Sequence, residues 1–248
     1  MKIITWNVNG IRARHAQLQE LIAVEQPDVI CLQEIKAAPD QVPALIAAPD
    51  GYWGYWHGGG GYSGVAVLVR SSAGGAQPTF AHPSFDVEHR IVVADLGVAR
   101  VASVYVPNGG KDYEAKLRFL TALGSWASET NVAGEALLVC GDLNVALEER
   151  DVHPKERKPN QVGTRPDERG LLTNLIGAGF VDVGRALDPD NDALFTWWAP
   201  WRNLRQRNIG WRIDYVLASR SLAASATRAA SLRESGTSDH APVVAHFA

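Results

Sequence analysis

The stretch ALLVCGDLN, residues 136–144, joins an uninterrupted apolar run to polar side chains at its end. An apolar run of this length, bounded by glycine, is typical of a buried strand. Asp142 and Asn144 follow the run at once. In layered α/β folds, ligands and catalytic groups gather at strand ends, so this stretch predicts a polar site at the end of a buried strand.

Similar strand-like runs recur on both sides of this stretch. They are KIITWNV (2–8), DVICLQE (28–34), GVAVLVR (64–70), RIVVADL (90–96), ARVASVYV (99–106), RIDYVLA (212–218) and PVVAHFA (242–248). Apolar residues at helical spacing predict helices over residues 15–26, 113–128 and 168–178. Some runs are separated by a helix and others are adjacent, as across Gly97. This mixture predicts α/β layers with antiparallel hairpins rather than a purely parallel sheet.

Length and composition indicate one domain over residues 1–248. The chain has 248 residues, two cysteines and no low-complexity linker. It has no run of about 18 apolar residues, and its N-terminus lacks the charged-then-apolar order of a signal peptide. Cys31 and Cys140 lie in apolar runs, where a small buried thiol is commoner than a ligand. We therefore expect a soluble, cytoplasmic protein that makes no membrane contact.

The charge pattern is local rather than global. A formal net charge of −3 gives no overall attraction to nucleic acid. Residues 201–212, WRNLRQRNIGWR, nevertheless carry four arginines and two tryptophans without an acid, and residues 155–169 add five basic side chains. Both segments could be solvated basic faces. Arginine interleaved with tryptophan is also what phosphate neutralisation combined with base or sugar contact requires.

Polar residues end strand-like runs at six places in the chain. They are Asn7 and Asn9, Gln33 and Glu34, Pro107 and Asn108, Asp142 and Asn144, Asp214, and Asp239 and His240. Each place alone is more often structural, since Asn9 begins a turn dipeptide and Glu34 could pair with Lys36. Six such endings in one chain favour a shared site.

Four carboxylates at one site would need positive charge. Two unit charges about 4 Å apart repel by roughly 4 kcal/mol at an effective dielectric near 20. With carboxylate and amide oxygens as ligands, the expected ion is Mg²⁺, or Mn²⁺ in its place. His240, oriented by Asp214, would supply a titratable imidazole. A hard metal, a carboxylate and an imidazole favour phosphodiester hydrolysis, whereas no H-E-x-x-H or paired C-x-x-C motif indicates a zinc enzyme.

An ordered set of motifs resembles the exonuclease III type of apurinic/apyrimidinic (AP) endonuclease, within the endonuclease/exonuclease/phosphatase superfamily. The motifs are TWNVNGIRAR (5–14), LQE (32–34), GYSGVAVL (61–68), YVPNGG (105–110), GDLN (141–144), GWRIDY (210–215) and SDHAPV (238–243). The resemblance implies a four-layer α/β sandwich, in which two packed mixed β-sheets are flanked by helices, as in deoxyribonuclease I. Tyr105 and the GWRIDY segment distinguish this type from relatives that have a catalytic histidine in place of Tyr105.

The resemblance also implies roles for individual residues. The implied metal site has Glu34 as the principal ligand, and the whole candidate set is Asn7, Asn9, Glu34, Asp142, Asn144 and Asp239. The implied catalytic residues, which position water, hold the phosphate or act as a general base, are Tyr105, Asp142, Asn144, Asp214 and His240. The implied DNA contacts, which hold the backbone or pack on an extrahelical sugar, are Asn108, Lys111, Trp197, Trp201, Arg205 and Trp211.

The implied activity is Mg²⁺-dependent incision of double-stranded DNA 5′ to abasic sites, with trimming of blocked 3′ ends, by a monomer. A missing base lowers the cost of extruding the sugar, so such damage can be selected without base reading. Three departures affect how far these roles can be transferred. Asn9 stands where some members have an aspartate, Lys111 stands where some members have an arginine, and residues 195–205 are rich in tryptophan. Two alternatives stay open, a phosphodiesterase of the same superfamily acting on RNA 3′ ends or lipid head groups, and a DNA-binding module without catalysis.

Overall fold

Two mixed β-sheets of six strands form the centre of the computed structural model, which describes residues 1–72, 76–132 and 134–248. The first sheet contains, in spatial order, β11 (Ala226–Ser231), β12 (Val243–Phe247), β1 (Lys2–Asn7), β2 (Val29–Gln33), β4 (Val65–Arg70) and β3 (Tyr52–His57). The second contains β5 (Thr79–Ala81), β6 (Ile91–Asp95), β7 (Arg100–Tyr105), β8 (Leu137–Asp142), β10 (Asp214–Ser219) and β9 (Phe180–Asp182). Each sheet has one parallel pair, β1 with β2 and β7 with β8, and its other pairs are antiparallel.

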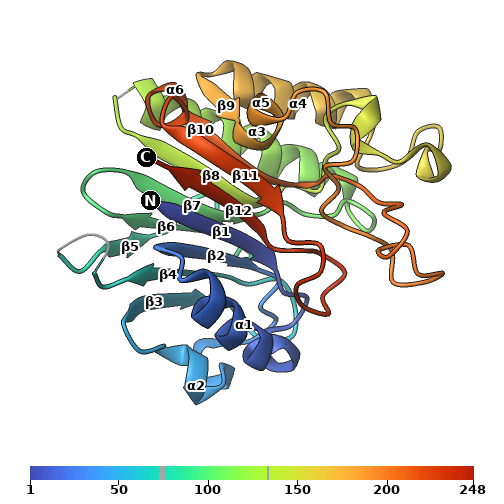
Figure 1. Ribbon diagram of the computed structural model, residues 1–248. Coiled ribbons are helices and arrows are strands. Elements are labelled where there is room, and N and C mark those ends of the chain that lie inside the picture. Colours follow the sequence, from blue (N-terminus) through green and yellow to red (C-terminus); the bar gives the residue numbers. More distant parts are fainter. Residues whose placement is uncertain (73–75, 133) are drawn as a thin grey trace.

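Helices cover the outer face of each sheet, so the molecule has four layers (Figure 1). α1 (Ile11–Glu25) and α2 (Ala44–Ala47) pack on the first sheet, and α3 (Tyr113–Val132) and α4 (Pro166–Gly177) pack on the second. The remaining short helices are α5 (Val183–Leu187), α6 (Arg220–Ala223), η1 (Pro39–Gln41), η2 (Glu149–Asp151) and η3 (Pro154–Glu156). The predicted four-layer α/β sandwich is confirmed.

Strand alternation places polar residues at the rim of the core between the sheets. On β1, Ile3 faces the inter-sheet core, whereas Ile4 and Trp6 face the helices outside. Side chains two residues apart share a face of a strand, so Asn7 points to the same inter-sheet side as Ile3. On β8, Asp142 likewise follows the inward-facing Leu138 and Cys140. The last inward position of each strand is thus polar, and it lies where the core meets solvent.

Strand pairing brings the six polar strand ends to the same rim. In the two parallel pairs, Asn7 lies beside Gln33, and Tyr105 lies beside Asp142. β10 runs antiparallel to β8 and begins with Asp214 opposite Asp142. β12 begins next to the end of β1, so the loop that precedes it also reaches this rim. The register therefore predicts contacts between the two ends of the chain, and Asn9 does hydrogen-bond to Asp239, 230 positions away.

A buried polar layer ties the two sheets together beneath the rim. The amide nitrogen of Gln33 donates to the hydroxyl groups of Thr5 and of Ser103 in the opposite sheet, each at 3.0 Å. Ser103 donates in turn to the carbonyl of Leu32 at 2.9 Å. All three side chains are fully buried, and unpaired polar groups there would be costly, so these bonds fix how the sheets meet.

The predicted elements are present, with small shifts at their ends. All eight strand-like runs form strands, and the hairpin across Gly97 joins β6 to β7. Cys31 and Cys140 are free, buried thiols in the inter-sheet core. Four strands were not predicted, namely β3, β5, β9 and β11. Among the described residues, no helix is both long and apolar enough to span a bilayer.

Gly141 allows β7 and β8 to approach each other at the start of the GDLN motif. Its φ of 148° is a conformation that side-chain-bearing residues rarely adopt. A Cβ atom built on it would collide with the carbonyl oxygen of Val104 on β7. The glycine therefore sets the position from which Asp142 projects.

We predict that Gly141→Ala destabilises the protein, because it combines backbone strain with a backbone collision. The expected loss in the free energy of unfolding is about 2–6 kcal/mol, measured by urea denaturation. Gly124→Ala is the matched control, because Gly124 lies inside α3 with open space around it. Alanine there should stabilise the helix by about 0.5–1 kcal/mol. Equal stability of Gly141→Ala and wild type would contradict the argument.

Candidate active site

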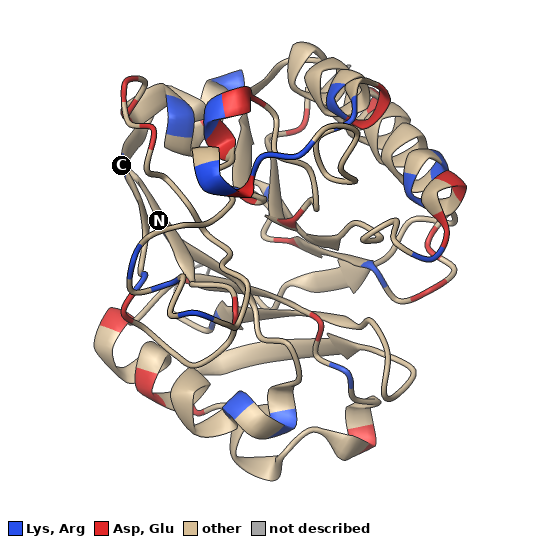
Figure 2. Cartoon of the chain, turned by 90° about the vertical axis from the view of Figure 1, so that its right-hand side faces the viewer, with Lys and Arg blue, Asp and Glu red and all other residues tan. Residues whose placement is uncertain are grey.

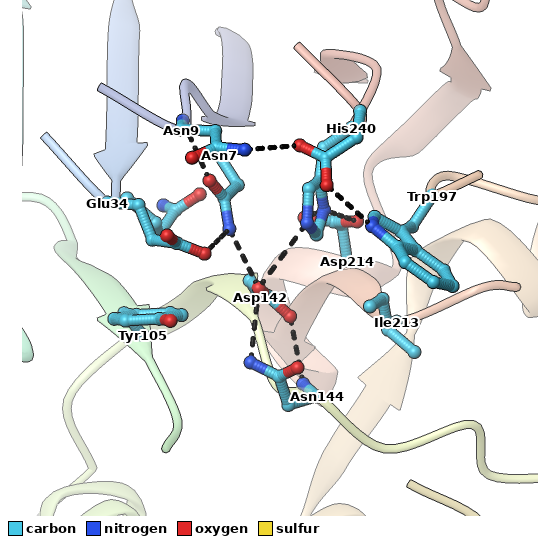
Figure 3. Close-up of polar contacts among 12 residues, drawn as sticks. Asn7, Asn9, Glu34, Tyr105, Asp142, Asn144, Trp197, Ile213, Asp214 and His240 are labelled. Carbon is cyan, nitrogen blue, oxygen red and sulfur yellow. Dashed lines mark hydrogen bonds and ion pairs between the residues drawn. The ribbon is translucent and has the colours of Figure 1, made fainter. Parts of the chain in front are cut away.

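Side chains from the strand ends meet at the rim between the sheets (Figure 3). Glu34, Asp142 and His240 each present a possible metal-ligand atom, and these atoms lie within 4.8 Å of one another. The amide nitrogen of Asn7 donates to a carboxylate oxygen of Glu34 and to one of Asp142, both at 2.9 Å. Residues from both sheets are thereby joined in one cluster.

Two left-handed backbone positions turn the chain away from its strands at this cluster. Glu34 follows β2 with φ 49°, and Asn144 follows β8 with φ 52°. Such angles are uncommon for residues other than glycine, and they concentrate at functional sites. The backbone nitrogen of Asn144 donates to Asp142 at 2.9 Å, and its side-chain amide donates to the carbonyl of Val106 at 2.9 Å. Both contacts hold the GDLN loop over the cluster.

His240 is oriented by a chain of buried hydrogen bonds. Its Nδ1 atom lies 2.9 Å from Oδ2 of Asp214, and the hydroxyl group of Thr196 donates to the same oxygen at 2.6 Å. Thr196 in turn accepts from the backbone nitrogens of Ile213 and Asp214, each at 3.1 Å. Because Asp214 accepts from Nδ1, the Nε2 atom faces Asp142, 3.8 Å away.

The charges in the cluster compensate one another. Burial lowers the pKa of His240, but the carboxylates of Asp214 and Asp142 outweigh it and raise that pKa to about 10. Burial raises the pKa of Asp142 to about 7. The imidazolium of His240 lowers this pKa, but burial and the negative charges of Asp214 and Glu34 outweigh it. An imidazolium between two carboxylates thus supplies part of the positive charge that the cluster requires.

Glu34 stays ionised at the open side of the cluster. Burial raises its pKa, but hydrogen bonds from Asn7 and Lys36 outweigh this and hold the pKa below the usual value. The ammonium group of Lys36 lies 2.7 Å from Oε2 of Glu34. The ion pair between Glu34 and Lys36 that the sequence suggested is therefore present. Lys36 also donates to the side-chain oxygen of Asn9 at 2.6 Å.

Asp239 lies beside the cluster, but among the described residues it is not one of the three whose ligand atoms converge. Its Oδ1 atom accepts from the amide of Asn9 at 2.9 Å, and its Oδ2 atom accepts from the indole of Trp197 at 3.0 Å. Burial raises the pKa of Asp239, but the charge of His240 and these two hydrogen bonds outweigh it, so the carboxylate is ionised.

The cluster forms one wall of a cavity of about 440 Å³. The lining residues are Glu34, Tyr105, Asn108, Asp142, Asn144, Glu156, Lys158, Gln161, Val162, Gly163, Trp197, Ala199, Trp201, Trp211, Ile213, Asp239 and His240. The lining includes three tryptophans, of which Trp197 lies next to His240. The buried indole nitrogen of Trp211 has no hydrogen-bond partner among the described residues. The cavity lining thus combines charged side chains with indole rings.

Comparison with known proteins identifies the family of this chain. A family model described as the Endonuclease/Exonuclease/phosphatase family matches residues 4–240. The chain belongs to this family. The match begins in β1 and ends at His240, so every strand end that contributes to the cluster lies within it.

Relatives of this endonuclease/exonuclease/phosphatase family member include named nucleases. The chain is 35% identical over 250 residues to an exodeoxyribonuclease of Bacillus subtilis, with 98% of each chain covered. It is 34% identical over 253 residues to Recombination repair protein 1 of Drosophila melanogaster; the match covers all of this chain but 37% of that longer protein.

Two solved structures share its fold. The 3′ phosphatase NExo from Neisseria, bound to a product DNA hairpin, superposes with a TM-score of 0.90 at 31% identity. An AP endonuclease from Archaeoglobus fulgidus superposes with a TM-score of 0.90 at 29% identity. Each comparison covers 100% of this chain and 99% of the other.

The residues predicted to contact DNA are distributed unevenly. Asn108, Trp197, Trp201 and Trp211 line the cavity, and the amide of Asn108 donates to the side-chain oxygen of Asn144 at 3.3 Å. Lys111 is exposed, but it does not line the cavity. The three predicted tryptophans thus line the same cavity, whereas Lys111 lies outside it.

Two arginines of the basic segment 201–212 have structural contacts instead. The guanidinium group of Arg205 donates to the carbonyls of Arg233, Ser235 and Ser238 at 2.5–2.7 Å. Arg212 is buried and makes a two-pronged ion pair with Asp151 at 2.8 and 3.0 Å. These groups therefore hold loops of the protein itself, and the DNA contact by Arg205 stays a prediction.

Sequence reasoning missed two supports of the site. Thr196 gave no signal, since a threonine before two tryptophans is ordinary. Lys116 is fully buried; it pairs with Glu168, and it donates to the carbonyl of Asn144 at 2.7 Å. Its only sequence signal is helical spacing, because a lysine four residues before Leu120 lies on the apolar face of α3.

We predict that His240 in metal-free protein titrates well above an ordinary histidine. Asp214→Asn should lower the pKa of His240 by more than about one unit, because the nearest negative charge is lost while burial remains. Imidazole chemical shifts in an NMR pH titration with chelator measure this directly. Asp40→Asn removes an exposed carboxylate elsewhere and should leave this pKa unchanged. A wild-type midpoint at or below 6.5 would contradict the assignment.

Proposed function

We propose that the chain is a Mg²⁺-dependent DNA-repair phosphodiesterase that incises the backbone 5′ to abasic sites and trims blocked 3′ ends. The observation that carries the proposal is the cavity of about 440 Å³, whose lining combines a carboxylate and imidazole cluster with three tryptophans. Relatives named exodeoxyribonuclease, 3′ phosphatase and AP endonuclease support DNA as the substrate. Double-stranded DNA with such lesions is the proposed partner of a monomer.

The donor chemistry of the cluster fits a hard divalent cation. Glu34 is ionised and lines the cavity, and amide and carboxylate oxygens are the ligands that Mg²⁺ prefers. We infer that Glu34 would hold the ion with Asn7 or Asn9 and with Asp239, close to Asp142 and Asn144. When bound, Mg²⁺, or Mn²⁺ in its place, would offset the charge that develops on the phosphate oxygens.

The chain's own residues would position the reactants. Asp142, with a pKa of about 7, can accept a proton from the attacking water near neutral pH. The imidazolium of His240 can donate from Nε2 to a phosphate oxygen, while Asp214 holds the ring. Burial, with the charges of Glu34 and Asp142, raises the pKa of Tyr105, so its hydroxyl group stays protonated and can also donate.

The tryptophans that line the cavity would select the lesion. An abasic nucleotide has lost its stacking and pairing, so it can be extruded at low cost. Trp197, Trp201 and Trp211 would pack around the exposed sugar. A sugar that carries a base would need more room beside these tryptophans. Selection would therefore depend on shape rather than on base reading.

Phosphate contacts would be few and local. The loops around the rim carry interspersed acidic and basic residues, and the net charge is −3 (Figure 2). Asn108 and Lys158 line the cavity, and Lys111 is exposed. These residues are the proposed contacts to the DNA backbone. The binding affinity should fall as the salt concentration rises, and the small number of charges involved sets how steeply it falls.

An incision assay tests the proposed function. A duplex with one abasic site should be cut 5′ to the lesion when Mg²⁺ is present and left intact when it is chelated. Glu34→Gln should lower turnover at least about 10²-fold, as losses of transition-state charge stabilisation typically do. Glu20→Gln, on the exposed face of α1, is the matched control and should be fully active.

The same assay separates the alternatives. Absence of incision with either Mg²⁺ or Mn²⁺ would overturn the proposal. Cleavage of RNA 3′ ends or phospholipid head groups, with none of abasic DNA, would indicate another phosphodiesterase of the family. Tight binding of abasic duplex without turnover, unchanged by Glu34→Gln, would indicate a DNA-binding module.

We predict that Trp201→Ala weakens binding to abasic duplex more than it slows chemistry. Trp201 lines the cavity yet is 59% exposed, so its truncation should not disturb folding. Loss of aromatic stacking should cost about 1–3 kcal/mol of binding free energy, with turnover at saturation nearly unchanged. Trp53→Ala is the control, because Trp53 is 39% exposed on β3 and does not line the cavity. Equal effects of the two variants would count against the contact.

A further inference from the structure

Three of the seven histidines lie together outside the catalytic cavity. His57 ends β3, the edge strand of the first sheet, and His82 follows β5, the edge strand of the second. The rings of His57 and His82 stack with centroids 4.4 Å apart, and His89 packs edge-on against His57 at 4.7 Å. The cluster therefore joins the two sheets at their edges.

A buried carboxylate anchors this histidine cluster. Oδ2 of Asp86 lies 2.7 Å from Nε2 of His57, and Oδ1 accepts from the backbone nitrogen of Arg90 at 2.8 Å. The side chain of Asp86 has no exposed surface. Burial raises the pKa of Asp86, but the bonds from His57 and Arg90 outweigh this and keep the group ionised. A fixed negative charge thus lies directly beside the imidazole rings.

We propose that His57, His82 and Asp86 form a second metal site, which binds a late first-row divalent cation such as Zn²⁺. Each residue offers one ligand atom, and the three atoms lie within 4.8 Å of one another. Two imidazole nitrogens and one carboxylate oxygen are a ligand set that zinc uses in proteins. Imidazole ligands favour zinc, copper or nickel, whereas an oxygen-rich site favours magnesium. The chain would therefore hold two cations of different chemistry.

The ion would take the place of the proton that His57 and Asp86 share. Their ligand atoms are 2.7 Å apart, so a small opening of this pair admits a cation between them. The ring of His82, which stacks on His57, would turn to aim a nitrogen at the same point, and His82 is exposed at the surface. Zinc bonds of about 2.0–2.2 Å are then within reach, with a coordination position left for water.

Occupancy would cross-link the two sheets. Two residues before His57, Tyr55 stacks on Phe80 of β5 at 5.3 Å, so β3 and β5 already touch at this edge. A metal ion would add a strong, directional contact between the same two segments. An ion that binds the folded chain in preference to the unfolded chain raises its stability, so zinc should raise the thermal unfolding midpoint.

Zinc titration of the full chain tests the proposal without DNA, so its result is independent of the proposed nuclease function. With Mg²⁺ in large excess, calorimetry should find one Zn²⁺ bound, and thermal unfolding should shift upward as Zn²⁺ is added. Co²⁺ in place of zinc should show visible absorption bands that report nitrogen ligands. His82→Gln should weaken Zn²⁺ affinity at least tenfold, because it removes one of three ligands.

Control variants separate this site from other zinc ligands. His15→Gln removes a histidine outside the cluster and should leave zinc affinity unchanged. His82→Gln should keep the Mg²⁺-dependent activity of wild type, since His82 does not line the cavity. Equal zinc affinity of His82→Gln and wild type would overturn the proposal. Loss of zinc binding in Glu34→Gln, or displacement of zinc by Mg²⁺, would assign the ion to the catalytic cluster and also overturn it.

Discussion

The buried carboxylate of Asp142 is the constraint around which the active site is built. A carboxylate removed from water and placed near Glu34 and Asp214 is costly unless donors and positive charge surround it. Asn7 and the backbone of Asn144 supply the donors, and the imidazolium of His240 supplies the charge. The same surroundings raise the pKa of Asp142 to about 7, which gives the proposed reaction a base near neutral pH.

The fold meets this constraint by bringing ends of both sheets together. Parallel pairing in each sheet, with antiparallel neighbours that start at the same rim, collects side chains from six strands. The buried contacts of Gln33 with Ser103 fix one sheet on the other. Gly141 allows the close approach of β7 and β8, and Lys116 holds the loop after β8 from outside. The geometry of the cluster therefore depends on residues that lie outside it.

Two cation sites of contrasting chemistry would lie on the same two sheets. The proposed magnesium site forms at central strands, where carboxylates and amides end the buried runs. The proposed zinc site forms at the half-buried edge strands β3 and β5, where His57 is the last residue of β3 and His82 follows β5. Oxygen ligands favour the hard ion and imidazole the softer one, so the two ions need not compete. One site would serve chemistry and the other would join the sheets.

The sequence alone determined the interior strands and the central cluster. Interior strands are buried on both faces and read as continuous apolar runs, and their polar ends marked Glu34, Asp142 and His240. The four strands it did not reveal, β3, β5, β9 and β11, are the four sheet edges, where a single neighbour and a half-exposed face leave little apolar signal. Only the tertiary structure decided which basic side chains make contacts within the protein. Arg205, for example, anchors a loop. Side-chain partners distant in sequence fix such roles, and no local pattern encodes them.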